Sequence, residues 1–354
     1  MRTSAEGPSE GTSGYCRPVA SDPASDSAAE GGESACMAHL LDVDGSPEGR
    51  SSTFTLTPSP PFRLDLTARV LRRSVRNEVD RWGDERRAYR RAVRTAAGVI
   101  EVQVTQIAPP ERPELEVRLD GPGATLLATR HQVATTIERS LGLQLNLQEF
   151  YELAADDPFL GPLSERFVGF RPPRFHTWIE GLVAAVSCQQ ITLVAGVQLL
   201  NRLAALAGPS GPAGAHVFPS AEDLAEVPPE RIRALGYSAR KAEVISSLAH
   251  AVASGELDLA PLEHAPDDEV RARLCELRGI GPWSAEYVML RFLGRVHVFP
   301  GDDVGAQNKL QRLLGLDVRP DRAATLALLE QWAPYAGLVY FHLLLESWPE
   351  PTSP

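Results

Sequence analysis

Residues 277–303, with the sequence LRGIGPWSAEYVMLRFLGRVHVFPGDD, constrain this chain more than any other stretch. Just before them, apolar residues recur at intervals of four and three in DEVRARLCEL, which predicts a helix with one buried stripe. Gly279 and Gly281 interrupt that pattern, and a second apolar face begins after Pro282, a residue that suits a first helical turn. The sequence therefore predicts a helix, a hairpin and a second helix, followed by a loop that ends in two carboxylates.

The two hairpin glycines fit two interpretations. Gly279 and Gly281 let backbone N–H groups approach an anion closely, and the positive end of the second helix points the same way. Such a hairpin binds a nucleic-acid backbone without reading its sequence. The same glycines also suit a plain turn between two helices, which needs them only for its geometry. The neighbouring residues help to choose between these interpretations.

LRGIGPWSAEY followed by FPGDD resembles the helix-hairpin-helix DNA glycosylases, specifically the AlkA-type DNA-3-methyladenine glycosylases. That family has a hairpin of the form LxGIGxxTA and, further along, a catalytic aspartate, whose place Asp303 takes here. Members that also cleave the sugar-phosphate backbone carry a lysine just after the second hairpin glycine, where this chain has Trp283. The resemblance therefore implies an enzyme, a monofunctional DNA glycosylase.

Three parts are predicted along the chain. Residues 1–51 are rich in small and acidic residues and lack the apolar run of a signal peptide, so a disordered tail is expected. Residues 52–145 mix helical patterns with strand-like ones such as VIEVQVTQ and LEVRLDG, which predicts a small mixed α/β domain. Residues 146–354 read as helices and resemble the glycosylase core of the family. The predicted fold class is α+β.

The net charge of −11 is unusual for a protein that binds DNA. It does not exclude DNA, because phosphate cradles and single arginines act over about one Debye length of ~8 Å. Arg87, Arg90, Arg91 and Arg94 lie in one segment, and either a solvated arginine face or a phosphate contact fits them. The four cysteines are too few and too scattered for a disulfide framework or a zinc site, so a reducing cytoplasm and no metal are expected.

The stretch 181–201 has no charged residue, but Gln189 and Gln190 stand at its middle. In lipid these amides would be left unpaired, so two helices of a soluble protein that meet at the glutamines are predicted, and no membrane span. SCQQIT resembles the glutamine pair with which family members approach the gap in the duplex. The resemblance implies that Gln189 or Gln190 fills the space that a flipped base leaves. Buried amides bonded to helix ends are the alternative.

The chemistry of a glycosylase requires a carboxylate close to the sugar. The target atom is unreachable inside a stacked duplex, so the nucleotide is flipped into a pocket. Positive charge develops on the sugar in the transition state, and Asp303 is the candidate that stabilises it and activates water. An aspartate after Pro-Gly is also a good helix N-cap, and Asp302 is an alternative for that role.

The base pocket is expected to be aromatic. Trp283 and Tyr287 stand at i and i+4, so their rings project to one side of the helix and can face a cationic base. Aromatic residues at this spacing also fit a helical core, but the resemblance implies the pocket. WAPYAGLVYFHLLLESW resembles the closing helix of the family, with Tyr335 at a pocket aromatic. It departs from the family at Ala336 and Leu338, where arginine and tyrosine or a small residue are common.

These features together predict a function. The resemblance implies hydrolysis of the N-glycosidic bond of alkylated purines of the 3-methyladenine type, in base excision repair. A non-catalytic helix-hairpin-helix DNA-binding protein and a glycosylase for oxidised or mismatched bases are the alternatives. The expected partner is double-stranded DNA with damaged bases, and the protein is expected to be a monomer. No cofactor is expected, although a monovalent cation at the hairpin, as in related structures, stays open.

Overall fold

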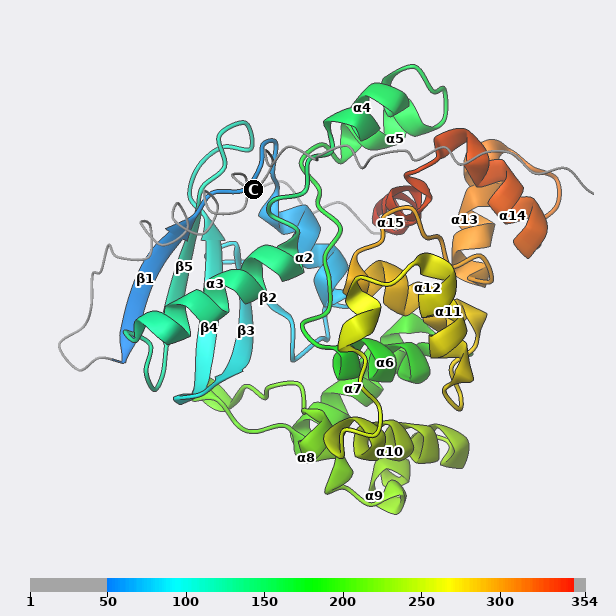
Figure 1. The fold of residues 1–354 in the computed structure, drawn as a ribbon. Helices are drawn as coiled ribbons and strands as arrows, with labels where there is room; N and C mark the ends of the chain where they lie inside the picture. Colours follow the sequence, from blue (N-terminus) through cyan, green and yellow to red (C-terminus); the bar gives the residue numbers. More distant parts are fainter. Residues whose placement is uncertain (1–49, 347–354) are drawn as a thin grey trace, which may run out of the picture. The chain divides into compact units, whose positions relative to one another are not determined.

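We describe the protein from a computed structural model, which covers residues 50–346 in the detail used below. Five antiparallel strands form one sheet in the order β1-β5-β4-β3-β2 (Figure 1). The strands are β1 (Ser51–Leu56), β2 (Arg81–Gly83), β3 (Ala88–Thr95), β4 (Gly98–Gln106) and β5 (Leu115–Asp120). VIEVQVTQ and LEVRLDG are confirmed as strands. Of the predicted disordered tail, residues 1–49 lie outside the described part, and residue 51 already belongs to β1.

Two helices accompany the sheet, α2 (Leu64–Arg72) and α3 (Leu127–Leu141). Both contribute to the apolar core under the strands. α2 buries residues on two sides, because Leu64, Ala68 and Leu71 join the core of the sheet whereas Leu66 and Val70 join a core of the helices that follow. Figure 1 shows α2 between the strands and α15, which it contacts. α2 is therefore the element that joins the sheet to the helices.

From residue 146 to residue 346 the described chain is helical, and its extended pairing is limited to an isolated bridge. The α-helices are α4 (Gln148–Ala155), α5 (Leu160–Arg166), α6 (Trp178–Cys188), α7 (Leu193–Ala207), α8 (Ala221–Ala225), α9 (Pro229–Ala234), α10 (Ala239–Ala253), α11 (Asp267–Glu276), α12 (Pro282–Val288), α13 (Val304–Leu314), α14 (Arg322–Leu329) and α15 (Ala336–Glu346). A π-helical turn, Met289–Leu293, continues α12. The antiparallel sheet with separate helices confirms the α+β class.

The apolar stretch 181–201 is divided into two helices, as predicted. The hydroxyl of Thr177 caps α6 by accepting from the N–H of Glu180, and the hydroxyl of Thr192 caps α7 by accepting from the N–H of Ala195. α6 is buried on all sides and contacts α7, α10 and α12, which explains its lack of charged residues except Glu180. Between residues 50 and 346, no helix is long and apolar enough to cross a membrane.

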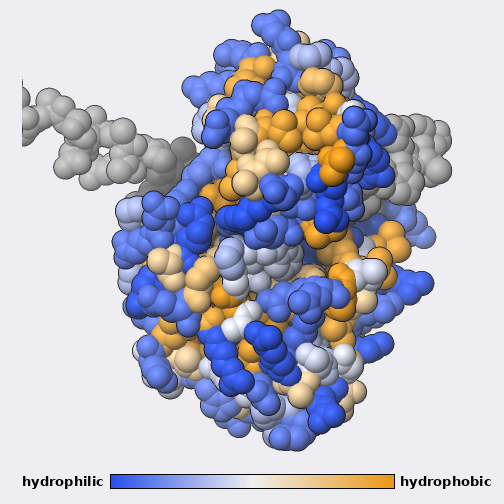
Figure 2. Space-filling model, turned by 90° about the vertical axis from the view of Figure 1, so that its right-hand side faces the viewer, coloured by the Kyte–Doolittle hydropathy of each residue, from blue (hydrophilic) through white to orange (hydrophobic). Residues whose placement is uncertain are grey.

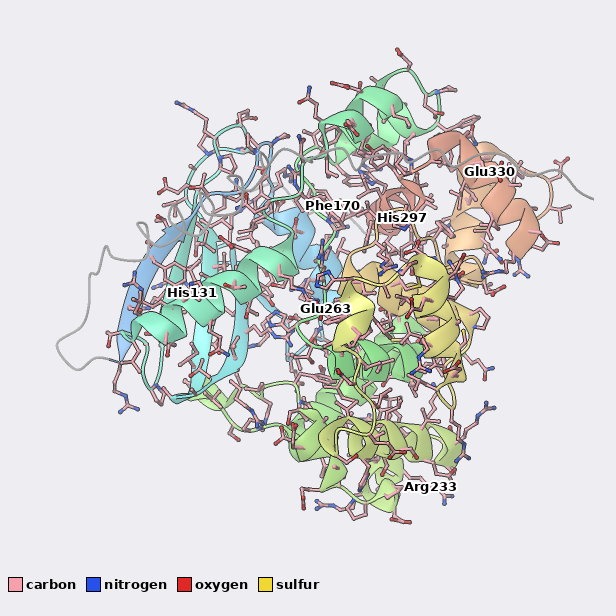
Figure 3. All side chains as sticks on the ribbon, viewed as in Figure 1. His131, Phe170, Arg233, Glu263, His297 and Glu330 are labelled. Carbon is pink, nitrogen blue, oxygen red and sulfur yellow. The ribbon has the colours of Figure 1, made fainter. Side chains whose placement is uncertain are left out.

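A second apolar core joins α4, α5, α13 and α15. Phe170, labelled in Figure 3, contributes its ring to this core. It packs against Phe341 and His342 of α15 at centroid distances of 5.8 and 5.6 Å. Burial lowers the pKa of His342 to about 4, so its imidazole is neutral near pH 7. This core holds α15 in place, and α15 supplies one wall of the site described below.

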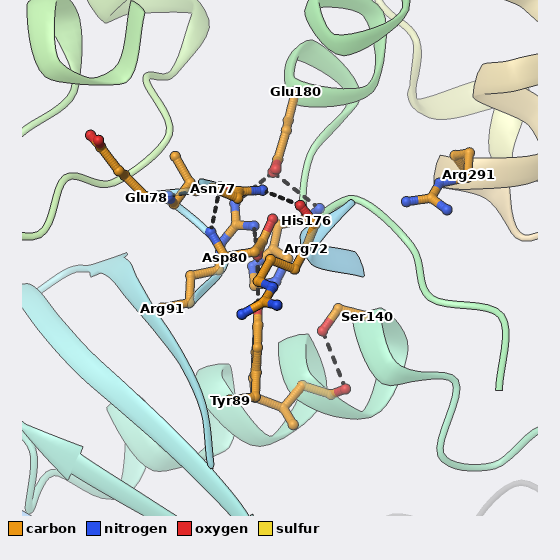
Figure 4. Close-up of polar contacts among 12 residues, drawn as sticks. Arg72, Asn77, Glu78, Asp80, Tyr89, Arg91, Ser140, His176, Glu180 and Arg291 are labelled. Atoms are coloured by element: carbon orange, nitrogen blue, oxygen red, sulfur yellow. Dashed lines mark hydrogen bonds and ion pairs between the residues drawn. The ribbon is translucent and has the colours of Figure 1, made fainter. Parts of the chain in front are cut away.

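A buried ion-pair network joins β3 to α6 (Figure 4). The guanidinium of Arg91 donates to Asp80 and to Glu180, both at 2.7 Å, and all three side chains are less than 5% exposed. The hydroxyl of Tyr89 also donates to Asp80, at 2.8 Å. Arg91 is therefore neither a phosphate contact nor part of a solvated arginine face. The low exposure makes this network sensitive to the loss of any one charge.

The other arginines of that segment are also engaged. Arg94 pairs with Asp223, Arg90 donates to the side-chain carbonyl of Gln103 at 3.0 Å, and Arg87 lies 3.9 Å from a carboxylate oxygen of Asp65. These contacts hold the sheet and its neighbours together. The side chains of Arg87 and Arg94 are still 64% and 45% exposed, so a solvated arginine face and a phosphate contact both stay predictions for these two.

Candidate active site

The hairpin has the predicted geometry. α11 ends at Glu276, and Gly279 follows with a φ of 85°, a left-handed conformation that favours glycine. A Cβ atom at Gly279 would lie 2.6 Å from a methyl carbon of Val244, so a side chain does not fit there. Gly281 precedes α12 in an extended conformation, and a Cβ atom there would meet nothing within 4 Å. The backbone at Gly281 is thus open to an approaching group.

The carboxylate of Asp303 accepts three hydrogen bonds and lines a cavity. One carboxylate oxygen accepts from the backbone N–H of Ala306 at 2.9 Å, so Asp303 is the N-cap of α13. The other oxygen accepts from the indole Nε1 of Trp283 at 3.2 Å and from the hydroxyl of Tyr340 at 3.0 Å. The two interpretations of Asp303, cap and site residue, are therefore compatible. Burial and the neighbouring Asp303 carboxylate raise the pKa of Tyr340 well above its ordinary value, so its hydroxyl stays a donor.

Asp302 has a different environment. Its carboxylate is 45% exposed and forms an ion pair with Arg322 at 2.9 Å. The same Arg322 donates to Glu286, whose carboxylate is 3% exposed and also accepts from the backbone N–H of Gly301 at 3.1 Å. Glu286 lies in α12 and therefore anchors to this helix the loop that contains both aspartates. Sequence analysis missed Glu286, although a single charge in the apolar run of α12 was a signal for a buried partner.

Trp283 and Tyr287 form the predicted aromatic pair. Their rings are stacked, with centroids 5.2 Å apart and an angle of 21° between the planes. Tyr287 is buried, whereas Trp283 is partly exposed and, like Tyr287, lines the cavity. The spacing of one helical turn and the Pro282 start of α12 place both rings on the same side.

Tyr335 does not line this cavity, which corrects its predicted place in the base pocket. It precedes the first residue of α15, and its hydroxyl donates to Glu149 of α4 at 2.9 Å. Its ring contacts that of Phe150, also in α4, at 5.6 Å. Tyr340 on α15 supplies the aromatic group near Asp303 instead. The segment was identified correctly, but the residue that reaches the cavity lies further along it.

The cavity has a volume of about 1160 Å³. Its lining comes from the end of α2, the junction of α6 and α7, α10, the hairpin, α12 with its π-helical turn, the loop before α13, α13 itself and α15. The residues include Arg73, Cys188, Gln189, Gln190, Lys241, Gly279, Gly281, Trp283, Tyr287, Arg291, Asp303, Lys309 and Tyr340. Exposed Ile191 and Val304 also belong to it. Figure 2 shows one face of the molecule, on which hydrophobic patches lie among hydrophilic residues.

The two glutamines have separate environments. The amide nitrogen of Gln189 donates to the carbonyl of Gly279 and to the hydroxyl of Ser284, both at 2.9 Å, so Gln189 ties the α6–α7 junction to the hairpin. Gln190 is exposed, with a left-handed φ of 55°. Lys241 of α10 donates to the carbonyls of Ser187 and Gln189 at 3.1 and 2.7 Å, which closes the end of α6. Burial lowers the pKa of Lys241.

A metal site was not expected, and the described residues show no group of three or more histidine, cysteine or acidic side chains that could hold one. The two cysteines in this part of the chain, Cys188 and Cys275, are free. A monovalent cation at the hairpin stays a prediction. Such an ion would bind backbone carbonyls, so no side chain marks its site.

Comparisons with known proteins show which family this chain resembles. The model of the HhH-GPD superfamily of base excision DNA repair proteins matches residues 183–334. The putative DNA-3-methyladenine glycosylase YfjP of Bacillus subtilis is 28% identical over 80% of this chain and 96% of that protein. A DNA-3-methyladenine glycosylase of the same organism is 30% identical over 60% of this chain and 72% of its own length. The 3-methyladenine DNA-glycosylase structure from Archaeoglobus fulgidus has a TM-score of 0.70 at 25% identity, and the match covers 82% of this chain and 97% of that one.

Proposed function

Because this chain belongs to the HhH-GPD superfamily of base excision DNA repair proteins and is a DNA glycosylase, we propose that it releases alkylated purines of the 3-methyladenine type. The bond hydrolysed is the N-glycosidic bond of a nucleotide flipped out of duplex DNA. The main support for this proposal is the carboxylate of Asp303. It accepts a hydrogen bond from Trp283 and lines the same cavity as the stacked Trp283 and Tyr287 rings. The names of the relatives support the substrate class.

In this reaction Asp303 stabilises the positive charge that develops on the sugar and orients the attacking water. The bonds from Trp283, Tyr340 and Ala306 hold the carboxylate before substrate arrives, so little reorganisation accompanies the chemical step. The water oxygen bonds to C1′ and gives up a proton to the Asp303 carboxylate, and the electron pair of the broken bond leaves with the base. An alkylated purine is cationic and departs as a neutral molecule, so the site needs no strong general acid.

The aromatic pair holds the base. A cationic purine stacked on Trp283 gains about 1–2 kcal/mol from the ring quadrupole when it is desolvated. The ring of Tyr287 lies behind that of Trp283 and fixes its orientation. The residue at position 283 is this tryptophan and not a lysine, which supports a monofunctional enzyme. Lys241 and Lys309 line the cavity, and Lys241 is already bonded to two carbonyls.

DNA binding follows from the hairpin and the α6–α7 junction. The open backbone at Gly281 and the start of α12 suit a phosphate group. Gln190 is the residue that we expect to fill the gap left by the flipped base, because it is exposed while both amide hydrogens of Gln189 are used in bonds to the hairpin. The partner is then double-stranded DNA with damaged bases. The monomeric state and the cytoplasmic location stay predictions.

The test uses duplexes that contain 3-methyladenine or 7-methylguanine. Free base in the supernatant and an intact strand that breaks only after alkali treatment are the expected results. Borohydride should trap no covalent complex, since no lysine follows the hairpin. Binding without base release would favour the non-catalytic alternative. Release of oxidised bases, or a trapped adduct at Lys241 or Lys309, would favour a different glycosylase.

A substitution at Gly281 tests the hairpin. Gly281→Ala should weaken binding to damaged and undamaged duplexes by the same factor, about 5- to 10-fold, because the methyl group displaces a phosphate from N–H donors worth about 1 kcal/mol each. Its thermal midpoint should be unchanged, since a Cβ atom there meets nothing within 4 Å. Titrations on both duplexes over a range of salt concentrations provide the measurement.

Gly279→Ala provides the contrast, because it should lower both binding and stability. Its backbone φ is 85°, and the added Cβ atom would lie 2.6 Å from a carbon of Val244. A Gly281→Ala protein that lost affinity for damaged DNA alone would contradict the phosphate-binding role.

A further inference from the structure

The backbone of Gly301, two residues before Asp303, is held on both sides by buried side chains. Its N–H donates to the carboxylate of Glu286 in α12 at 3.1 Å, and its carbonyl accepts from the side-chain amide of Gln307 in α13 at 2.8 Å. Glu286 and Gln307 are 2% and 5% exposed, so water competes little for these hydrogen bonds. The loop before α13 therefore contains a residue whose backbone is fixed by two helices.

Arg322 in α14 binds the carboxylate of Glu286. Its two terminal nitrogens donate to the two carboxylate oxygens, the bidentate arrangement that gives an arginine–carboxylate pair a defined direction. A Cβ atom at Gly301 would lie 3.1 Å from Nη1 of Arg322, so the guanidinium also lies directly against the loop. The same nitrogen donates to the exposed carboxylate of Asp302 at 2.9 Å. We call Glu286 and Arg322 together the loop clamp.

The loop clamp also reaches the hairpin. Glu286 belongs to α12, the second helix of the hairpin, and Nε of Arg271 in α11, the first helix, lies 3.6 Å from its carboxylate. One buried carboxylate thus joins both hairpin helices, α14 and the loop that contains Asp303. Neither Glu286 nor Arg322 lines the cavity, so any effect of these two residues on the chemistry passes through the loop.

Stability alone does not account for the loop clamp. A buried ion pair is a weak source of stability, because the removal of both charges from water offsets most of their attraction. An apolar pair of similar volume can be equally stable, but it would leave the N–H of Gly301 without an acceptor. What Glu286 and Arg322 supply is direction, since each of their hydrogen bonds fixes the position of a particular atom.

A shift at Gly301 would move Asp303 as well. The N–H of Asp303 donates to the carbonyl of Pro300 at 2.9 Å, so residues 300–303 form one tight turn. The three hydrogen bonds to the Asp303 carboxylate orient that group, whereas the loop clamp places the backbone that carries it. A catalytic group that is displaced by about 1 Å can lose about 10²-fold in rate.

We propose that Glu286 and Arg322 are positioning residues of the glycosylase, which hold the turn 300–303 so that the Asp303 carboxylate stands at the sugar of the flipped nucleotide. This inference rests on the proposed function and deepens it. The loop clamp contributes to the chemical step and not to DNA binding, because the hairpin backbone and the aromatic pair contact the phosphate and the base. The exposed ion pair with Asp302 adds little, since water and salt screen it.

The experiment compares Glu286→Gln, Arg322→Met and the variant with both changes with the unaltered enzyme. Single-turnover release from a 7-methylguanine duplex is measured over a range of enzyme concentrations, which gives a maximal rate and a half-saturating concentration. Thermal midpoints are measured for each protein. The control is Glu101→Gln. Glu101 in β4 accepts from one nitrogen of Arg81 through both carboxylate oxygens, at 2.7 and 2.8 Å, and lies outside the cavity.

Glu286→Gln and Arg322→Met should each lower the maximal rate by about 10- to 100-fold, the effect of a displaced catalytic group. At position 286 the new amide has one acceptor oxygen for the donors of Gly301 and Arg322, so one contact is lost. The half-saturating concentration should change by less than about 3-fold, because the groups that bind DNA are unaltered.

The double variant tests whether the two residues act together. It should be no more than about 3-fold slower than the slower single variant, because both changes release the same loop. Glu101→Gln should match the unaltered enzyme in maximal rate and in half-saturating concentration, whatever its thermal midpoint.

Three outcomes would overturn the inference. They are maximal rates within about 3-fold of the unaltered enzyme for both single variants, losses that multiply in the double variant, and a change in half-saturating concentration as large as the loss of rate. If Glu286→Gln does not fold, Arg322→Met decides, because its side chain is 33% exposed and is replaced more easily. Failure of the unaltered enzyme to release the base would instead contradict the proposed function, so the two failures are distinguishable.

Discussion

Asp303→Asn is expected to abolish base release while DNA binding stays close to that of the unaltered protein. The loss should be at least about 10²- to 10³-fold, the usual effect of removing a preorganised electrostatic group. The amide keeps the shape of the side chain but removes the charge that stabilises the sugar cation. It also has one oxygen for three donors, those of Trp283, Tyr340 and Ala306, so one of its contacts is lost. Single-turnover release and binding titrations measure the two effects separately.

Asp302→Asn is the matched control. Asp302 stands next to Asp303 in the chain but is 45% exposed and paired with Arg322. An exposed ion pair contributes little, so the rate should change by less than about 3-fold. Equal losses in the two variants, or a greater loss for Asp302→Asn, would show that the catalytic carboxylate has been assigned to the wrong residue.

Arg91→Met should destabilise the protein by about 3–5 kcal/mol, because it leaves two buried carboxylates without their partner. Asp80 and Glu180 are 2% and 4% exposed, so water cannot replace the lost guanidinium. The thermal midpoint should fall by roughly 10 °C. The control is Arg90→Met, since Arg90 is only partly buried and donates to neutral Gln103. Midpoints within a degree of each other in the two variants would contradict the structural role of the network.

The deficit of Arg91→Met should depend on pH. Burial raises the pKa of Glu180, and the charge of Arg91 opposes that rise. Without Arg91 the pKa of Glu180 rises further, so the folded state binds a proton at a pH at which the unfolded state has lost it. Stability then increases as the pH falls. Unfolding measured at about pH 8 and about pH 5.5 should show the greater deficit at the higher pH.

The sequence supported correct predictions where one local pattern determined the structure. Hydrophobic spacing and the glycines predicted the hairpin, and the period-two alternation predicted β4 and β5. The strand β3 was not predicted, because its arginines suggested a charged surface. Arg91 points inward from that strand, toward acids at Asp80 and Glu180. Only the folded chain shows such a pairing, since the partners lie in different elements.

In the site, too, residues within one continuous segment were predicted correctly, whereas residues from other elements were not. Asp303, Trp283 and Tyr287 belong to one continuous segment, and the structure brings them to one cavity. Tyr340 was missed in favour of Tyr335, because the sequence does not determine where α15 begins or which of its faces meets Asp303. Arg73 had no motif at all, since it comes from the end of a helix beside the sheet. Residues that reach a site from another part of the chain leave no local pattern.

The cavity draws on Arg73 near one end of the described chain and on Tyr340 near the other. The hydrogen bond from Arg73 to Tyr287 joins residues 214 positions apart, so its formation costs the entropy of closing a long loop. A chain still on the ribosome can build its sheet and most of its helices, but it lacks α15 and the hydroxyl that holds Asp303. Partly synthesised molecules therefore have no complete site, and base removal starts only with fully folded enzyme.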